Sequence, residues 1–202
     1  MASVNDNSKY IRLVREFVTE LLCKLPSNMC YHNLKHTEEV VDACILLAVH
    51  SKLNPIEKEI LIISAWFHDA GHIKTYFGHE IAGADLAEKF LRKIKYPSER
   101  IREVSACILC THYPPNPQNQ IQKILCDADM FHLTLNDYED RCLKLKQEIE
   151  SVSNCNIPLQ SWYDKNIDFL KKQFYFSKYG KKLFSKLKES NLNKFICNHC
   201  NT

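Results

Sequence analysis

The sequence contains little glycine or proline and no long apolar run. Only four glycines and seven prolines occur among the 202 residues, which favours long helices over closely spaced turns. No apolar run approaches the roughly 20 residues that a membrane-spanning helix needs. Residues 1–10 are polar, so no secretory leader is visible there. We therefore expect a cytoplasmic protein with no membrane partner.

The sequence also lacks a strong net charge and any convincing strand pattern. A formal net charge of +3 is too small to indicate nucleic-acid binding by itself, so we expect no nucleic acid duplex as a partner. Apolar residues recur at three- and four-residue spacing, as in amphipathic helices. These features predict an all-α fold of about eight or nine helices, with a single domain at residues 1–190 and a tail at 191–202.

The ten cysteines are spread along the chain, mostly within helical patterns. This distribution favours free thiols over a disulfide framework. Cys197 and Cys200 form half of a possible zinc site, but a structural zinc ion needs four ligands and no second Cys-x-x-Cys pair lies nearby. A flexible tail is the favoured interpretation, and a zinc site remains the alternative.

One predicted helix, at about 55–70, includes a stretch from Leu61 to Phe67 that is apolar on almost every side and leads into the pair His68-Asp69. A helix of this kind belongs in the interior of a protein, and Gly71 suits its C-terminal cap. Polar groups at the end of a buried helix need partners. A metal ion suits His next to Asp best, and His72 brings a third polar group to the same place.

Four groups have the chemistry to meet at one ion: His36, His68, Asp69 and one of the pair Asp127 and Asp129. Two imidazoles with two carboxylates suit Mn, Fe, Co, Ni, Zn or, less well, Mg. On a six-coordinate ion this set leaves positions for a water and a phosphate oxygen. The two aspartates stand about 200° apart around a helix axis, so both cannot face the ion.

The order of these residues resembles the HD superfamily of metal-dependent phosphohydrolases, in particular its small stand-alone members. Five motifs over about residues 28–135 carry the resemblance: Tyr31-His32-Asn33-Leu34-Lys35-His36, Phe67-His68-Asp69-Ala70-Gly71-His72, His79-Glu80, Thr111-His112 and Asp127-Ala128-Asp129. The resemblance implies an HD-type helical bundle, completed by C-terminal helices at 136–190. It also implies hydrolysis of phosphate esters, commonly of nucleotides, and favours Asp129 as the fourth ligand.

The resemblance implies roles for further polar residues. The Tyr-His-Asn-x-x-His motif is similar to the opening motif of cyclic-nucleotide phosphodiesterases, which implies that His32 is the general acid and His36 a metal ligand. The chain is shorter than those catalytic domains, so their substrate is not carried over. For His72, a catalytic role and a helix-capping role both stay open. Three other residues are expected to contact substrate or support the ligands: His79, Glu80 and His112.

The main hypothesis is therefore an enzyme that cleaves a phosphomonoester or phosphodiester bond of a small molecule, with a nucleotide as the expected substrate. One alternative is a catalytically silent HD module that senses a nucleotide. The other is a di-iron oxygenase on the same fold. The sequence does not predict the substrate, the number of metal ions or the oligomeric state.

Overall fold

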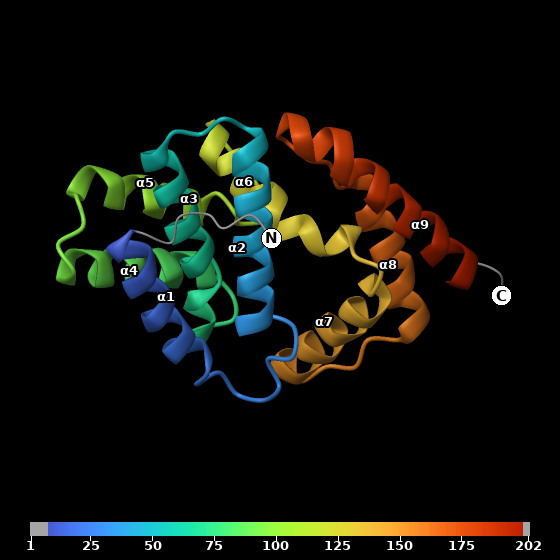
Figure 1. Cartoon of the computed structure of the whole chain (residues 1–202). Coiled ribbons are helices and arrows are strands. Elements are labelled where there is room, and N and C mark those ends of the chain that lie inside the picture. The colour runs from blue at the N-terminus through green and yellow to red at the C-terminus, as the bar shows by residue number, and fades with distance from the viewer. Residues whose placement is uncertain (1–7, 200–202) are drawn as a thin grey trace.

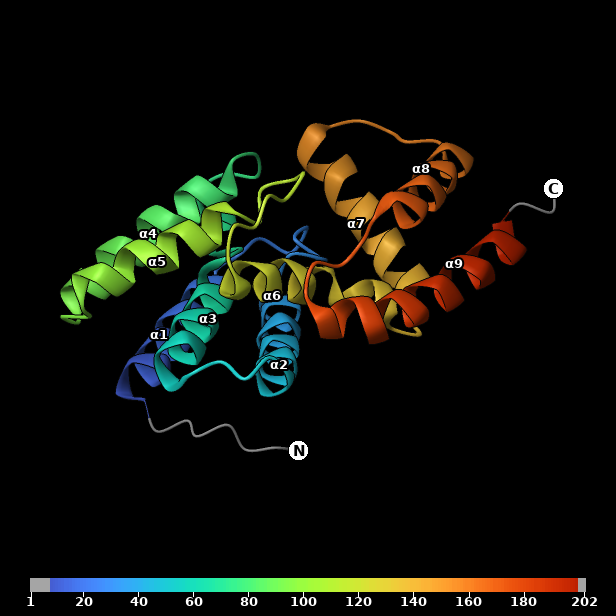
Figure 2. The same cartoon turned by 90° about the horizontal axis from the view of Figure 1, so that it is seen from above.

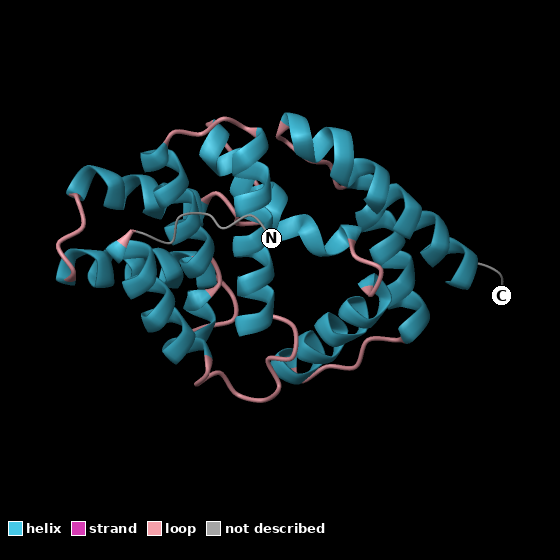
Figure 3. Ribbon diagram, viewed as in Figure 1, coloured by secondary structure: helices cyan, strands magenta, loops and turns pink. Residues whose placement is uncertain are grey.

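The computed structural model describes residues 8–199, and every regular element in this range is a helix (Figures 1 and 3). Nine α-helices occur in it: α1 (Lys9–Leu22), α2 (Leu34–His50), α3 (Pro55–Phe67), α4 (His79–Lys93), α5 (Ser98–Leu109), α6 (Gln120–Asp129), α7 (Tyr138–Ser153), α8 (Leu159–Lys172) and α9 (Ser185–His199). Two short 3₁₀ helices follow α3 and α6, η1 (Ala70–Ile73) and η2 (Met130–Thr134), and a π-helical turn, η3 (Gly180–Phe184), precedes α9. The predicted all-α fold is confirmed for these residues.

Helix α3 forms the centre of the first six helices. It packs against α1, α2, α5 and α6, and every residue from Ile60 to Phe67 is buried. Its start follows the sequence signal: Pro55 opens the helix, and the Asn54 side chain accepts hydrogen bonds from the backbone N–H of Ile56 and Glu57. Because the second half of this helix is enclosed on all sides, the residues after it emerge inside the protein.

Helix α3 ends at Phe67, and the prediction that Gly71 is its C-terminal cap is wrong. The chain continues from His68 into η1, and Gly71 lies against the first turn of α4. A Cβ atom on Gly71 would stand 1.8 Å from the carbonyl oxygen of His79. Gly71 is therefore needed for close approach, and this approach brings the start of α4 next to the end of α3.

The C-terminal helices form a second apolar cluster. Figures 1 and 2 show α7, α8 and α9 gathered on one side of the molecule, away from α1, α4 and α5. Leu133, Trp162 and Phe195 are among the buried residues of this cluster, which is separate from the core around α3. Met130, at the start of η2, packs against both clusters and joins them.

Helix α9 continues to His199, so the prediction that a tail begins at residue 191 is wrong for residues 191–199. The Asn191 side chain donates hydrogen bonds to the carbonyl oxygens of Leu133 and Leu135 at 2.9 and 2.7 Å, and Phe195 is buried. These contacts hold the last turns of the helix on the second cluster. Cys200, half of the possible zinc motif, lies outside the described residues.

The described residues also bear on the state of the cysteines and on membrane-spanning helices. The eight cysteines from Cys23 to Cys155 are free thiols, as predicted. Among the described helices, none combines the length and the apolar character that a membrane span requires.

We expect Gly71→Ala to lower the free energy of unfolding by about 2–3 kcal/mol, because the new methyl group collides with rigid backbone. Gly78→Ala is the matched control: Gly78 has φ of +72° but nothing within 4 Å of an added Cβ. It should cost only about 1 kcal/mol of backbone strain. Urea unfolding of both variants measures the difference, and equal losses would contradict a close approach at Gly71.

Candidate metal centre

Four side chains from three helices converge at one point inside the protein. His36 comes from α2, His68 and Asp69 directly follow α3, and Asp129 is the last residue of α6. The Nε2 atom of His36 lies 3.4 Å from an oxygen of Asp69 and 3.4 Å from one of Asp129. The Nε2 atom of His68 lies 3.2 and 3.6 Å from the same two oxygens. We call these four residues the four-residue cluster.

The four-residue cluster fits a single metal ion. Ligand atoms about 2.1 Å from one ion stand about 3.0–3.4 Å apart in octahedral or tetrahedral geometry, close to the observed 3.2–3.6 Å. The Nε2 of His68 and Oδ2 of Asp69 are buried without a hydrogen-bond partner, which is costly unless a ligand takes them. The Nδ1 of His68 donates to the carbonyl oxygen of Ala65 at 2.8 Å, so the Nε2 lone pair is left for an ion.

His68 and the two aspartates of this cluster shift each other's pKa values, because they lie so close together. Burial lowers the pKa of His68, but the carboxylates of Asp69 and Asp129 outweigh it, so the pKa lies well above its usual range. Burial likewise raises the pKa of Asp69, and His68 outweighs this effect, so its pKa is well below the usual range. A metal ion must therefore displace a proton from His68, and binding should weaken as the pH falls.

Asp127 points away from the four-residue cluster. Its carboxylate accepts hydrogen bonds from the backbone N–H groups of Phe176 and Ser177 at 2.6 and 2.8 Å. Gly180 lies so close that an added Cβ would stand 2.3 Å from Oδ2 of Asp127. Asp127 thus attaches the segment between α8 and α9 to α6, whereas Asp129 stands beside the histidines.

His32 precedes α2 and is held by Glu148 of α7, a residue that the sequence analysis did not single out. The fully buried Glu148 carboxylate contacts Nδ1 of His32 and accepts hydrogen bonds from the backbone N–H groups of Tyr31 and His32 at 2.8 and 3.0 Å. Burial raises the pKa of Glu148, but the bonds from His32 and the backbone outweigh it, so its pKa lies below the usual range. The ionised carboxylate fixes the imidazole and leaves its Nε2 for the site.

A pattern in α7 points to Glu148. Cys142, Leu145 and Ile149 recur at three- and four-residue spacing, which marks the inward face of an amphipathic helix. Glu148 lies on this face, where a carboxylate needs a partner. The sequence alone does not reveal that this partner is a histidine more than a hundred residues earlier.

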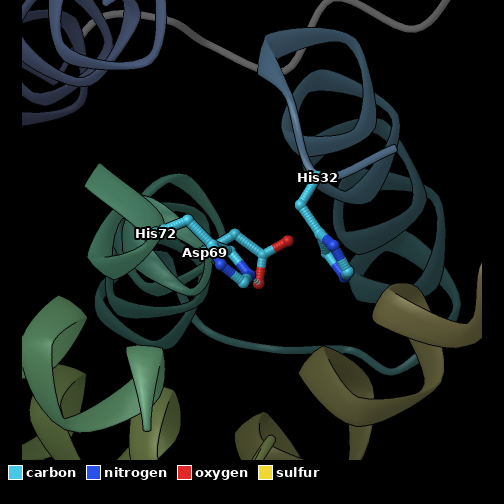
Figure 4. A group of neighbouring side chains, drawn as sticks. All are labelled: His32, Asp69 and His72. Atoms are coloured by element: carbon cyan, nitrogen blue, oxygen red, sulfur yellow. Dashed lines mark ion pairs between the residues drawn. The ribbon is translucent and has the colours of Figure 1, made fainter. Parts of the chain in front are cut away.

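The second oxygen of Asp69 faces another pair of histidines. Oδ1 lies 3.4 Å from Nε2 of His79 and 4.0 Å from Nε2 of His72, and the two rings stack with centroids 3.9 Å apart. Figure 4 shows His32, Asp69 and His72 directed toward one another. Each of these three residues has a ring nitrogen or a carboxylate oxygen that could bind a metal, and these atoms lie within 4.8 Å of one another. The three residues therefore form a second group able to hold an ion.

The environment of His72 bears on the two roles left open for it. Neither ring nitrogen has a hydrogen-bond partner within the described part of the chain, so the side chain does not cap α3. Burial lowers the pKa of His72 to about 3. A ring with this pKa stays neutral near pH 7 and is a weak base.

Glu80 and His112 lie at the edge of the site. Glu80 is buried in the first turn of α4, and its Oε1 stands 3.1 Å from Nδ1 of His112 and 3.7 Å from Nε2 of His79. The His112 side chain is 69% exposed. The structure therefore brings His79 and Glu80 into the site, whereas His112 reaches it only through Glu80.

A cavity of about 360 Å³ adjoins these groups, within the size range of small-molecule sites. On one side it is lined by His32, Asp69, His79, Glu80 and Asp129. The opposite side, which we call the distal wall, comes from α7 and α8 and consists of Tyr138, Arg141, Cys142, Leu145, Trp162, Lys165, Asn166 and Phe169. The cavity thus lies between the first six helices and the C-terminal helices.

Comparisons with known proteins show the family of this chain. The model of the HD domain family matches residues 33–134, just over half of the sequence, and the chain belongs to this family. A solved structure similar to it is that of a predicted HD superfamily hydrolase from an uncultured Thermotogales bacterium. The two chains are 19% identical with a TM-score of 0.65, over 94% of this chain and 90% of the other. This likeness shows the fold alone, and the comparison with curated proteins found no match.

We expect Asp129→Ala to weaken metal binding and Asp127→Ala to lower the stability of the fold. Removing a carboxylate beside the histidines should weaken Mn binding by at least about 100-fold, more than the loss of an outer partner usually costs. Removing Asp127 leaves two backbone N–H groups without acceptors, which should lower the free energy of unfolding by about 2–4 kcal/mol. Elemental analysis after equilibrium dialysis and urea unfolding measure the two effects. Loss of metal from the Asp127 variant alone would contradict this assignment.

Proposed function

We propose that this protein is a metal-dependent hydrolase that cleaves a phosphomonoester or phosphodiester bond of a small molecule, with a nucleotide as the expected class of substrate. The observation that supports it best is the four-residue cluster, two of whose members, Asp69 and Asp129, line a cavity of small-molecule size. Membership of the HD-domain family and the hydrolase with the similar fold agree with it. We propose neither a nucleic acid duplex nor a membrane as a partner.

In this proposal the four-residue cluster holds a divalent ion. When bound, such an ion lowers the pKa of a water ligand and neutralises charge on a phosphate group. Asp69 and Asp129 supply the negative charge that retains the ion, and the hydrogen bond that His68 donates to the carbonyl oxygen of Ala65 keeps its ring in place. The apolar residues of α3 behind the cluster limit access of bulk water to it.

His32 is the proposed proton donor to the leaving oxygen. Glu148 occupies Nδ1 of His32, which orients the ring and leaves Nε2 as the atom that can pass a proton to the substrate. His32 lines the cavity on the same side as the two aspartates. His72 is neutral and buried, so we do not propose it as the proton donor. Its role in this proposal is to bind the substrate or a metal ion.

The histidine pair beside Oδ1 of Asp69 supports one second candidate, a two-metal site like that of a di-iron oxygenase. Elemental analysis separates the two proposals. One ion per chain with hydrolytic activity fits the hydrolase, whereas two irons per chain with oxygen consumption and no hydrolysis would favour the oxygenase.

We expect hydrolysis to depend on added metal and on Asp69. A panel of phosphate monoesters and diesters should release product with Mn, Ni, Co or Mg. Asp69→Ala should reduce kcat/KM by at least about 1,000-fold, because the ion loses a central ligand. Asp85→Ala, which removes an exposed carboxylate of α4, is the matched control and should stay active. If metal-loaded protein releases nothing across the panel, the hydrolase proposal fails, and a nucleotide-sensing module becomes the better description.

We expect Glu148→Gln to slow hydrolysis according to the leaving group. An alkyl phosphate needs a proton on its leaving oxygen and should react about 100-fold more slowly, whereas a nitrophenyl ester needs less help and should slow much less. His32→Ala should show the same dependence, and the double variant should be no worse than the single ones. An equal loss for both kinds of ester, with unchanged metal content, would contradict the role given to Glu148.

A further inference from the structure

The distal wall offers a mainly apolar surface to whatever enters the cavity. Its aromatic side chains are Tyr138, Trp162 and Phe169, and Leu145 lies among them. The Nε1 of Trp162 donates to the carbonyl oxygen of Cys142 at 3.1 Å, so the indole is held in place by a contact inside the wall. Flat, fixed rings of this kind bind other flat or apolar groups.

The polar atoms of this wall are already paired with each other. The hydroxyl of Tyr138 donates to Oδ1 of Asn166 at 3.1 Å, and Nδ2 of Asn166 donates to the carbonyl oxygen of Trp162 at 2.8 Å. These groups are therefore not free to bind the polar parts of a ligand without losing a bond.

The charge of Arg141 is balanced in the same way. Its Nη1 and Nη2 atoms donate to the two carboxylate oxygens of Glu39 at 2.6 and 2.9 Å, and its Nε donates to Asp137 at 2.8 Å. A guanidinium held by two carboxylates has little attraction left for a phosphate. Of the described residues that line the cavity, only the exposed Lys165 is a cation without a partner.

The opposite side of the cavity carries three carboxylates, and its histidines His32 and His79 already face Glu148 or these carboxylates. Asp69, Asp129 and Glu80 all line it, and one divalent ion balances two of these three charges. Sites that hold two or more phosphates surround them with several free lysines, arginines or metal ions. Beside one bound ion, the described lining of this cavity offers no comparable group of free cations for a second phosphate.

We infer that the ligand of this cavity carries a single phosphate group, which faces the metal cluster, and an uncharged aromatic or apolar group, which lies on the distal wall. Nucleoside diphosphates, nucleoside triphosphates and pyrophosphate should then bind more weakly, because of their additional charge. The inference rests on the proposed function for the position of the phosphate. The discriminating elements are α7 and α8, outside the residues that match the HD family.

Binding of unreactive phosphonates to Mn-loaded protein tests the apolar part. By titration calorimetry we expect phenylphosphonate to bind at least about tenfold more tightly than methylphosphonate, because the ring is removed from water. Phe169→Ala removes a half-buried ring from the distal wall. It should reduce the preference for phenylphosphonate over methylphosphonate at least about threefold. Equal affinities of the wild-type protein for the two phosphonates would overturn the inference.

The inference that the ligand carries a single phosphate is tested by comparing the binding of adenosine monophosphate with that of the methylene-bridged analogue of adenosine diphosphate. The monophosphate should bind at least about fivefold more tightly to the Mn-loaded protein, because the diphosphate adds negative charge without a cation to meet it. Glu39→Gln releases much of the charge of Arg141, and should narrow this difference at least about threefold. Glu38→Gln, an equal charge change at the neighbouring exposed position, should leave it unchanged.

Tighter binding of the diphosphate analogue by the wild-type protein would overturn the inference. An unaltered preference in Glu39→Gln would also overturn it, because the wall would then not be the source of discrimination. These results are separable from those of the hydrolysis panel. A protein that hydrolyses phosphate esters but prefers diphosphates refutes the inference alone, and one that binds phenylphosphonate selectively without hydrolysis refutes the proposed function alone.

Discussion

The site depends on burying a polar pair at the end of an apolar helix. The second half of helix α3 is enclosed by the surrounding helices α1, α2, α4, α5 and α6, and its continuation carries His68 and Asp69 into the interior. Neither group can be solvated there, so each must be satisfied by neighbours or by an ion. The surrounding elements are arranged accordingly: α2 contributes His36, α6 contributes Asp129, and the close approach at Gly71 brings α4 to the second oxygen of Asp69.

Much of this arrangement could be predicted from the sequence, because it is encoded locally. The capped start of α3, the apolar character of its second half and the His-Asp pair that follows it are all visible within about twenty residues. Helical geometry also showed that Asp127 and Asp129 cannot share a target, whereas the choice of Asp129 followed from the family resemblance. The spatial convergence of the ligands followed from family resemblance, and not from any local signal.

The features that were missed depend on contacts between distant parts of the chain. Glu148 finds His32 only because α7 packs over the loop before α2. The last turns of α9 remain helical because Asn191 and Phe195 dock on residues that are about sixty and thirty positions away. Gly71 stands where a glycine cap of α3 was expected. Glycine is required there because the backbone of α4 passes too close for a Cβ atom, and not because of a positive φ. In each case a tertiary contact decides what a local pattern leaves undetermined.

Helix α7 joins two tasks in one rigid element. Arg141 and Glu148 are seven residues apart, or two turns, so they lie about 10 Å from each other along the same helical face. The first fixes the cavity wall to α2 through Glu39, and the second orients His32 just before α2. A sliding movement of α7 would therefore misalign the proton donor whenever it reshaped the cavity. New specificities in relatives with this construction should consequently arise from substitutions on α8, for which the described residues show no comparable hydrogen bond to the metal side.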